Sequence, residues 1–538
     1  MKTIYYNGAV YTGALPLAEA FAVEDGRFTF AGTSNDALAL KHPGDNLVDL
    51  NGSFVCAGFN DSHMHLLGLG EALSSARLDQ HTGSLTELIA CLKDFADNHG
   101  PARGWIFGRG WNQDYFSDEV RMPNRWDLDK VSTEYPVCAV RACGHALAVN
   151  SRALSLLGIT ADTPQPDGGQ IVLENGEPNG VFFDNAMELV YSAVALPSKE
   201  EIKAMLRNAC RALNSFGVTS CQSDDYCVFP ALSWAPINEA FHELEEAGEL
   251  SVRVYEQSNF TNLPALQSFV QAGNRTGTGT DRFRIGPLKI LGDGALGART
   301  AFLSNPYADA PETCGIPVFS QETFDEMIGY ANEQGMQVAV HAIGDACLDR
   351  VLSALTKALD ANPRVDHRHG IVHCQITRAD QLQKIAGMGL HVYAQSIFLD
   401  YDLNILESRV GKDLTRTSYC WNTLRKTGAT VSNGTDCPVE LPFALGGIQC
   451  AVTRRNLNAT VPAHQPEEAF TVQQAIDSYT CWGAYASFEE AIKGKIEPGM
   501  LADFVVLGGN PFTVPANEIK DIPVFATYVG GEMVYNRV

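Results

Sequence analysis

The sequence has little of the positive charge that a nucleic-acid-binding or membrane-surface protein needs. Its 538 residues carry 63 acidic and 39 lysine or arginine side chains, a formal net charge of −24. Phosphate backbones and anionic lipid surfaces bind proteins through clustered lysine and arginine, so this balance argues against nucleic acid and membrane as partners. We therefore expect a small-molecule substrate. The sequence leaves open whether the chain forms a homo-oligomer.

Long hydrophobic runs and cysteine motifs are also missing. No stretch approaches the roughly 18 uninterrupted apolar residues of a membrane span, and Met1 to Gly8 lacks the apolar core of a signal peptide. The 14 cysteines are scattered, include no Cys-X-X-Cys and mostly lie in apolar runs such as Pro136 to Val140. This usage is typical of reduced, buried thiols. We expect a soluble, cytoplasmic protein.

The two ends of the chain share a strand-rich pattern. Residues 2–57 alternate apolar and polar side chains between Asn-Gly and Asp-Gly turns, and residues 501–507 and 524–535 have the same character. A lone hairpin is marginal in water. We therefore predict one small β-sandwich built from residues 1–57 and 495–538.

The body between these ends alternates strand-like and helix-like segments. Helical periodicity covers residues 199–216, 321–335 and 378–389. Eight strand-like apolar runs lie at residues 54–65, 217–224, 252–256, 283–291, 336–341, 370–373, 390–394 and 429–432. Strands alternating with helices in this number predict an α/β fold, a (β/α)8 barrel over residues 58–74 and 185–494.

One segment does not follow this rhythm. Residues 75–184 are rich in Trp, Pro and Gly and come directly after the first barrel strand. We interpret them as an insertion that covers the barrel mouth.

Two histidines close the first strand-like run. Because strand side chains alternate between faces, His63 and His65 would point the same way and could hold one metal ion through neutral imidazoles. The alternative is that the pair lies in a polar turn without a ligand.

Four further residues stand on or just after later strands. Lys289 is flanked by apolar residues, so its ammonium must be paired, neutral or modified, for example as a carbamate that bridges two metals, unless it reaches water at an edge. His341 and His373 end apolar strands, where a single histidine is more often structural. Asp436 follows the eighth strand and could bind metal and accept a proton, or simply occupy a Gly/Pro turn. Together with the histidine pair these residues form one constellation at the strand ends, where barrel enzymes have their active sites.

The motifs around these residues resemble the amidohydrolase superfamily, and specifically the YtcJ-like metal-dependent amidohydrolase group that includes N-substituted formamide deformylase. The resemblance spans nearly the whole chain. It rests on residues 60–65, 144–150, 289–300, 341–345, 371–375, 434–439 and 494–503.

This resemblance implies a distorted TIM-like barrel with a split β-sandwich and one or two divalent metal ions, most often zinc. In the binuclear pattern one metal is held by His63, His65 and Asp436. The other is held by His341 and His373, and carboxylated Lys289 bridges the two. In a mononuclear site, His373 would instead orient the substrate or a neighbouring group.

The resemblance also implies hydrolysis of a non-peptide C–N bond, in an amide or cyclic amide, by metal-activated hydroxide with Asp436 as the proton carrier. His145 and Arg299 are candidates for contacting the substrate or the developing oxyanion, and each could equally be structural. Two alternatives remain. The first alternative is deamination of a ring amidine. Related deaminases resemble each other in a glutamate three residues after the fifth-strand histidine, and Gly344 at that position counts against this alternative. A non-catalytic binding protein would not need so many metal-ligand side chains together.

Overall fold

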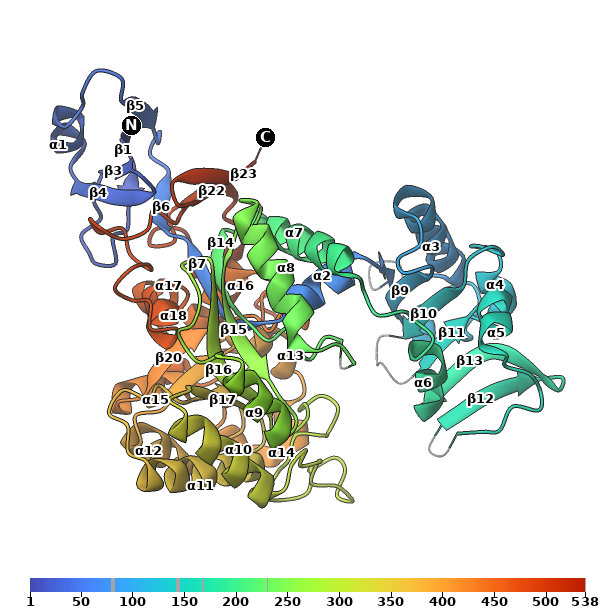
Figure 1. Cartoon of the computed structure of the whole chain (residues 1–538). Helices are drawn as coiled ribbons and strands as arrows, with labels where there is room; N and C mark the ends of the chain where they lie inside the picture. The colour runs from blue at the N-terminus through green and yellow to red at the C-terminus, as the bar shows by residue number, and fades with distance from the viewer. Residues whose placement is uncertain (79–82, 142–145, 167–168, 230, 538) are drawn as a thin grey trace. The chain divides into compact units, whose positions relative to one another are not determined.

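The structure, a computed structural model, describes residues 1–78, 83–141, 146–166, 169–229 and 231–537. The chain divides into two compact units (Figure 1). One comprises Met1–Gly68 and Ala209–Val538, and the other comprises Leu69–Asn208. Each is described by itself.

The first unit contains the predicted barrel. Eight parallel strands follow one another around the sheet, and they pair in chain order: β7 (Phe59–Met64), β14 (Val218–Ser223), β15 (Arg253–Asn259), β16 (Phe283–Leu291), β17 (Val338–Ala342), β18 (Gly370–His373), β19 (His391–Ala394) and β20 (Thr430–Asn433). Most of their residues are buried, which explains why the sequence shows continuous apolar runs rather than alternation. The predicted α/β barrel is confirmed.

Helices connect these strands, as the periodicity predicts. Those of the barrel unit are α8 (Trp234–Glu246), α9 (Leu263–Gln271), α10 (Gln321–Glu333), α11 (Asp345–Ala361), α12 (Ala379–Gly387), α13 (Leu399–Asp402), α14 (Leu406–Thr415), α15 (Trp421–Thr427), α16 (Ala444–Thr453), α17 (Val472–Ser478) and α18 (Cys481–Ala486). Side-chain caps begin three of them: the side-chain oxygens of Asn262, Ser320 and Thr471 accept from the N–H groups of Ala265, Thr323 and Gln474 before α9, α10 and α17.

Hydrogen bonds beyond the strand ends bring the first and last barrel strands together. Asp436 N–H donates to His63 O over 2.8 Å, and His65 N–H donates to Cys437 O over 2.7 Å. The buried Asp61 carboxylate accepts from Thr435 N–H (3.0 Å) and from the Thr435 hydroxyl (2.5 Å). These contacts set the position of Asp436 relative to both histidines.

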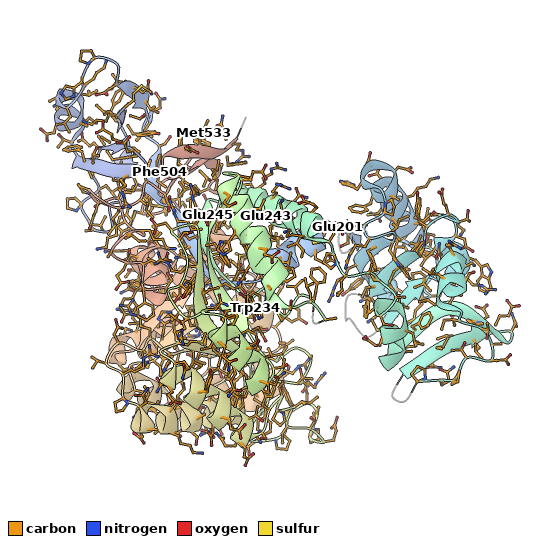
Figure 2. All side chains as sticks on the ribbon, viewed as in Figure 1. Glu201, Trp234, Glu243, Glu245, Phe504 and Met533 are labelled. Atoms are coloured by element: carbon orange, nitrogen blue, oxygen red, sulfur yellow. The ribbon has the colours of Figure 1, made fainter. Side chains whose placement is uncertain are left out.

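The termini form two further sheets, which confirms the predicted β-sandwich. One has the order β4 (Arg27–Gly32), β3 (Ala20–Glu24), β1 (Thr3–Tyr6), β5 (Asn46–Asp49), and the other has the order β2 (Ala9–Val10), β6 (Phe54–Ala57), β21 (Phe504–Leu507), β22 (Val524–Val529), β23 (Glu532–Asn536). Aromatic rings from both ends of the chain meet between them: Phe21 stacks on Tyr5 at 4.7 Å and meets Phe504 edge-on at 4.9 Å. Figure 2 labels Phe504. Each terminal segment thus buries its apolar face against the other.

The first strand-like run, residues 54–65, differs from the prediction of one strand. It forms two strands in two different sheets, β6 in the sandwich and β7 in the barrel, with Gly58 between them. A Cβ atom at position 58 would lie 2.2 Å from Thr219 Cγ2. Only glycine allows this close approach, so the chain changes sheets there.

The second unit has its own sheet and core. Within its described residues the strand order is β12 (Gly169–Glu174), β13 (Glu177–Asp184), β11 (Ala146–Val149), β10 (Val137–Arg141), β9 (Ile106–Trp111), β8 (Ala76–Arg77), accompanied by α3 (Leu85–His99), α4 (Arg125–Leu128), α5 (Ser151–Leu157) and α6 (Glu188–Tyr191). Helices α2 (Leu66–Leu73) and α7 (Lys199–Ser215) lie where the chain passes between the two units. The predicted insertion falls within this unit, and its place over the barrel mouth stays a prediction.

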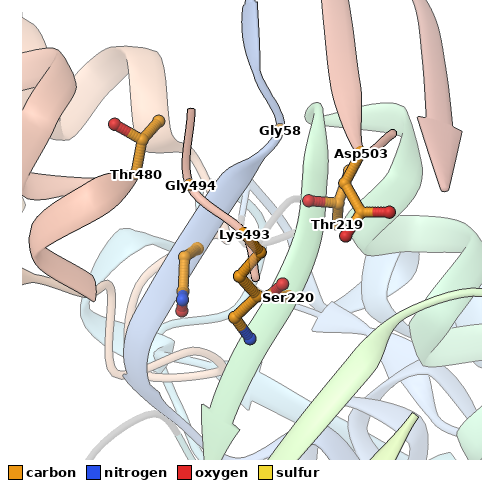
Figure 3. A pocket seen from close by; sticks show the side chains of 8 residues that line it. Gly58, Thr219, Ser220, Thr480, Lys493, Gly494 and Asp503 are labelled. Carbon is orange, nitrogen blue, oxygen red and sulfur yellow. The ribbon is translucent and has the colours of Figure 1, made fainter. Parts of the chain in front are cut away.

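A small cavity lies at the barrel base, where β7 and β14 begin (Figure 3). Its volume is about 10 Å³, and its lining includes Asn60, Ser220, Lys493 and Asp503. This is the end of the strands opposite to the candidate residues. Among the helices of the described ranges, none combines the length and apolarity that crossing a membrane requires.

Candidate metal centre

Four histidines and one aspartate converge at the carboxyl ends of the barrel strands. The Oδ1 atom of Asp436 lies 3.3 Å from His63 Nε2 and 3.2 Å from His65 Nε2. The Nε2 atom of His373 lies 2.9 Å from His341 Nδ1. Ligand atoms of His63, His373 and Asp436 all lie within 4.8 Å of one another, so the two pairs form one cluster. The structure brings together these five predicted residues.

Two of these residues have a backbone conformation that non-glycine residues rarely adopt. The φ angle is 74° at His373, 49° at the following Cys374 and 58° at Asp436. Such conformations cost free energy and are found where the surrounding structure imposes them, often at functional sites. Here Trp421 Nε1 donates to His373 O over 3.1 Å, which helps to hold the strand end in place.

Backbone carbonyls determine where two of the rings carry hydrogen. His65 Nδ1 lies 2.7 Å from Asp224 O, and His341 Nε2 lies 3.1 Å from Gly294 O. A carbonyl oxygen only accepts, so both nitrogens must donate. In the neutral rings the lone pairs are therefore on His65 Nε2 and His341 Nδ1, the atoms that face the cluster. A metal ligand needs this arrangement.

Charge states in the cluster also suit a cation. Burial lowers the pKa of His63 to about 4 and that of His373 well below its usual value, so both rings are neutral at pH 7. Burial alone would raise the pKa of Asp436, but the neighbouring His63 and His65 rings hold it well below its usual range. Burial alone would also lower the pKa of His65, which contact with Asp436 raises well above its usual value. The proton that His65 and Asp436 share is one that a metal ion would replace.

Lys289 is buried beside this cluster. Its Nζ lies 3.0 Å from Asp224 Oδ2, each side chain is 2% exposed, and Asn259 Nδ2 donates to the same oxygen over 3.0 Å. The lysine is thus paired, which is one of the three states predicted for it. After burial, the positive charge of Lys289 also contributes to the lowered pKa of His63 and of His373.

A second group of metal-ligand side chains adjoins the first, formed by His65, Asp224 and the exposed Cys227. Two of its ligand atoms are already engaged: His65 Nδ1 donates to Asp224 O, and Lys289 pairs with Asp224 Oδ2. The cluster around Asp436 is therefore the better metal site, and its donor set of imidazole nitrogens and a carboxylate fits a divalent ion such as zinc.

Comparison with known proteins decides the family. The family model described as "Amidohydrolase family" matches residues 46–535, most of the chain. The chain belongs to the amidohydrolase family.

Individual amidohydrolases agree over the full length. The chain is 34% identical to the protein YtcJ of Bacillus subtilis (strain 168), over 100% of both chains. It is 25% identical to the N-substituted formamide deformylase of Arthrobacter pascens over 97% of this chain and 95% of that one. A solved metal-dependent hydrolase from Pyrococcus furiosus is 29% identical, with a TM-score of 0.78 over 95% of this chain and 100% of that one. The family predicted from the motifs is confirmed, and it implies a divalent metal.

The two predicted substrate contacts have different outcomes. The Arg299 guanidinium donates to Asp309 Oδ1 (3.1 Å) and Oδ2 (2.9 Å), and Arg409 contacts the same carboxylate. Arg299 is thus engaged in an ion pair in the loop after β16. His145 lies outside the described residues. The role of each in binding substrate stays a prediction.

Sequence reasoning missed two carboxylates of this amidohydrolase centre, Asp224 and Asp293. Asp293 is fully buried and accepts from the N–H groups of Phe302 (2.8 Å), Ile343 (3.0 Å) and Gly344 (2.8 Å). Its Oδ1 lies 3.3 Å from His341 Nε2, so it positions that ring. Each follows or ends an apolar strand, the same signal that identified Asp436.

Proposed function

We propose that this amidohydrolase cleaves a non-peptide C–N bond in an amide or cyclic amide, using one or two divalent metal ions, most suitably zinc. The observation that carries the proposal is the cluster itself: a carboxylate between two histidines, with a second histidine pair beside it, at the active end of a barrel. The related formamide deformylase supports this class of bond.

The side chains divide the metal ligation between them. His63, His65 and Asp436 would hold one ion, and His341 and His373 a second. Lys289 would bridge them as a carbamate: its ammonium would leave Asp224 and lose one proton, and the neutral amine would then add carbon dioxide, which forms an N–C bond and releases a second proton. When bound, a divalent metal supplies Lewis acidity that polarises a carbonyl and makes water nucleophilic at neutral pH.

Asp436 is the proposed proton carrier. Its carboxylate is ionised at neutral pH and 8% exposed, so it can accept a proton from the attacking water and return it to the leaving nitrogen. The Phe398 ring, which is only partly buried, stacks on His373 at 5.9 Å with an interplanar angle of 15°. It offers an apolar face to a substrate beside the centre.

Carboxyl groups near Asp436 favour an uncharged substrate. Burial, together with the nearby Asp400, Asp402 and Asp436, raises the pKa of Glu440 to about 7. A substrate that carries its own carboxylate would be repelled there. We therefore propose neutral N-formyl amines and cyclic amides over N-acyl amino acids.

Deamination is less well supported. Related deaminases resemble each other in a glutamate at the position that Gly344 occupies in this chain. A Cβ atom at position 344 would lie 2.0 Å from Phe302 O. No larger side chain fits without moving that loop. A non-catalytic binding role would leave the ionised Asp436 and the neutral histidines without a purpose.

The test combines metal analysis with a substrate screen. Purified protein is expected to hold about one to two metal equivalents, to lose turnover on chelation and to regain it with added metal. The screen compares N-formyl amines, hydantoin-like rings, N-acyl amino acids, dipeptides and lactones. Full activity in metal-free, folded protein would refute the proposal, as would turnover of lactones alone.

A further inference from the structure

Two buried glutamines contact the metal centre, although neither stands out in the sequence. Gln257 on β15 places its Oε1 2.7 Å from His63 Nδ1. Gln395, just after β19, places its Oε1 2.9 Å from His373 Nδ1. Both side chains are fully buried. Each glutamine meets the ring nitrogen that faces away from the cluster.

The amide groups cannot rotate freely, because their nitrogens are also engaged. Gln257 Nε2 donates to Ser62 O over 3.2 Å, and Gln395 Nε2 donates to Tyr393 O over 2.9 Å. A backbone carbonyl only accepts, so the NH2 end of each amide must face it. The oxygen end then faces the histidine, and the histidine must donate.

We propose that Gln257 and Gln395 are positioning residues that fix His63 and His373 as Nδ1–H tautomers and so reserve both Nε2 lone pairs for the metal. This inference rests on the proposed metal centre. Backbone carbonyls do the same for His65 and His341. All four rings are therefore held from behind by an oxygen.

One close contact shows why this matters. His373 Nε2 and His341 Nδ1 lie 2.9 Å apart. When both rings are neutral, Gly294 O takes the hydrogen of one ring and Gln395 that of the other, so both facing nitrogens present lone pairs. Two acceptors at this distance repel unless a cation lies beside them. Gln395 therefore makes the pair of His341 and His373 a binding site for a cation rather than an ordinary hydrogen bond.

The experiment removes the acceptor while it keeps the volume. Gln257→Met and Gln395→Met retain a side chain of similar length without an oxygen, whereas Gln257→Glu and Gln395→Glu keep an acceptor. Gln222→Met is the matched control: Gln222 is a buried glutamine on β14 whose Nε2 donates to Gly483 O (2.8 Å), away from the histidines. Zinc affinity is measured by competition with a chelator.

Loss of a group that orients a metal ligand typically weakens metal binding about 10- to 100-fold. We expect this loss in both Met variants, substantial recovery in the Glu variants and near-native affinity in Gln222→Met. The second readout is ¹⁵N NMR of histidine-labelled, metal-free protein. It should show Nδ1–H for His63 and His373 in the wild type and a mixture of tautomers for the ring next to each Met substitution.

Native zinc affinity in both Met variants would overturn the inference, as would Nε2–H tautomers in the wild type. These failures differ from failure of the proposed function. A wild-type protein that binds zinc but cleaves no C–N bond leaves the tautomer argument intact. If the Met variants keep both turnover and native zinc affinity, the positioning role of the glutamines is refuted and the proposed function stands.

Discussion

The two ends of the barrel both bury polar side chains, but they arrange them in opposite ways. At the base, opposite charges meet: Arg253 donates to Asp503 over 2.6 Å and 2.9 Å, and Lys493 lies 2.6 Å from Glu489. At the mouth, two nitrogens that are both acceptors in the neutral rings, His341 Nδ1 and His373 Nε2, face each other across 2.9 Å. These charges at the base neutralise each other, whereas the mouth is complementary to an added cation. Burial of polar groups alone therefore does not identify a binding site. A binding site is indicated where neighbouring buried groups do not pair with each other and an added ion would pair with both.

The largest expected effect comes from removing the charge at the mouth. Asp436→Asn keeps the shape and a ligand oxygen but cannot accept a proton, so kcat should fall about 100- to 10,000-fold, the usual contribution of a general base. Metal content should remain largely unchanged. Steady-state kinetics with metal analysis checks both, and near-native kcat would remove Asp436 as the proton carrier.

Breaking a pair at the base should affect stability instead. Arg253→Met leaves the Asp503 carboxylate buried and without its partner, which typically costs about 3–5 kcal/mol of unfolding free energy. Denaturant unfolding measures the loss, and Arg253→Met with Asp503→Asn should recover part of it. Turnover per folded molecule should stay native. A fall in turnover without a fall in stability would contradict the division between the two ends.

A change in pH should mainly affect metal binding at the barrel mouth. Contact with Asp436 raises the pKa of His65, so metal binding must displace a proton below that pKa. Zinc affinity should then rise with pH, by about tenfold per unit for one displaced proton, and level off above the pKa of His65. Chelator competition between pH 5 and pH 9 tests this, and an affinity independent of pH would show that His65 is not a ligand.

The smallest effect on zinc content and kcat is expected from a substitution in the second group of metal-ligand side chains, formed by His65, Asp224 and Cys227. Cys227 is exposed, and its Sγ lies 3.8 Å from His65 Nδ1. Cys227→Ser should leave zinc content and kcat close to native, because the metal is assigned to the cluster around Asp436. Loss of one metal equivalent would instead place an ion between His65, Asp224 and Cys227.

The sequence predicts those parts of this molecule that local patterns encode. The continuous apolar runs predict the barrel strands, and a histidine or aspartate at the end of such a run indicates the centre. Gln257 could not be found this way, because a single glutamine in a strand has no pattern and its partner His63 is 194 residues away. The sequence places the domain boundary between residues 57 and 58, but the break of the apolar run 54–65 into two strands has no local signal, since Gly58 is required by Thr219 from another strand.

The contact between His65 and Asp436 has a consequence for how the protein is made. The two residues are 371 positions apart in the chain. At synthesis rates of about 5–20 residues per second, His65 is added to the chain on the order of 20–75 s before Asp436. Neither the barrel nor its metal site can be complete before then, so a metal ion acquired during translation would meet only part of its ligands.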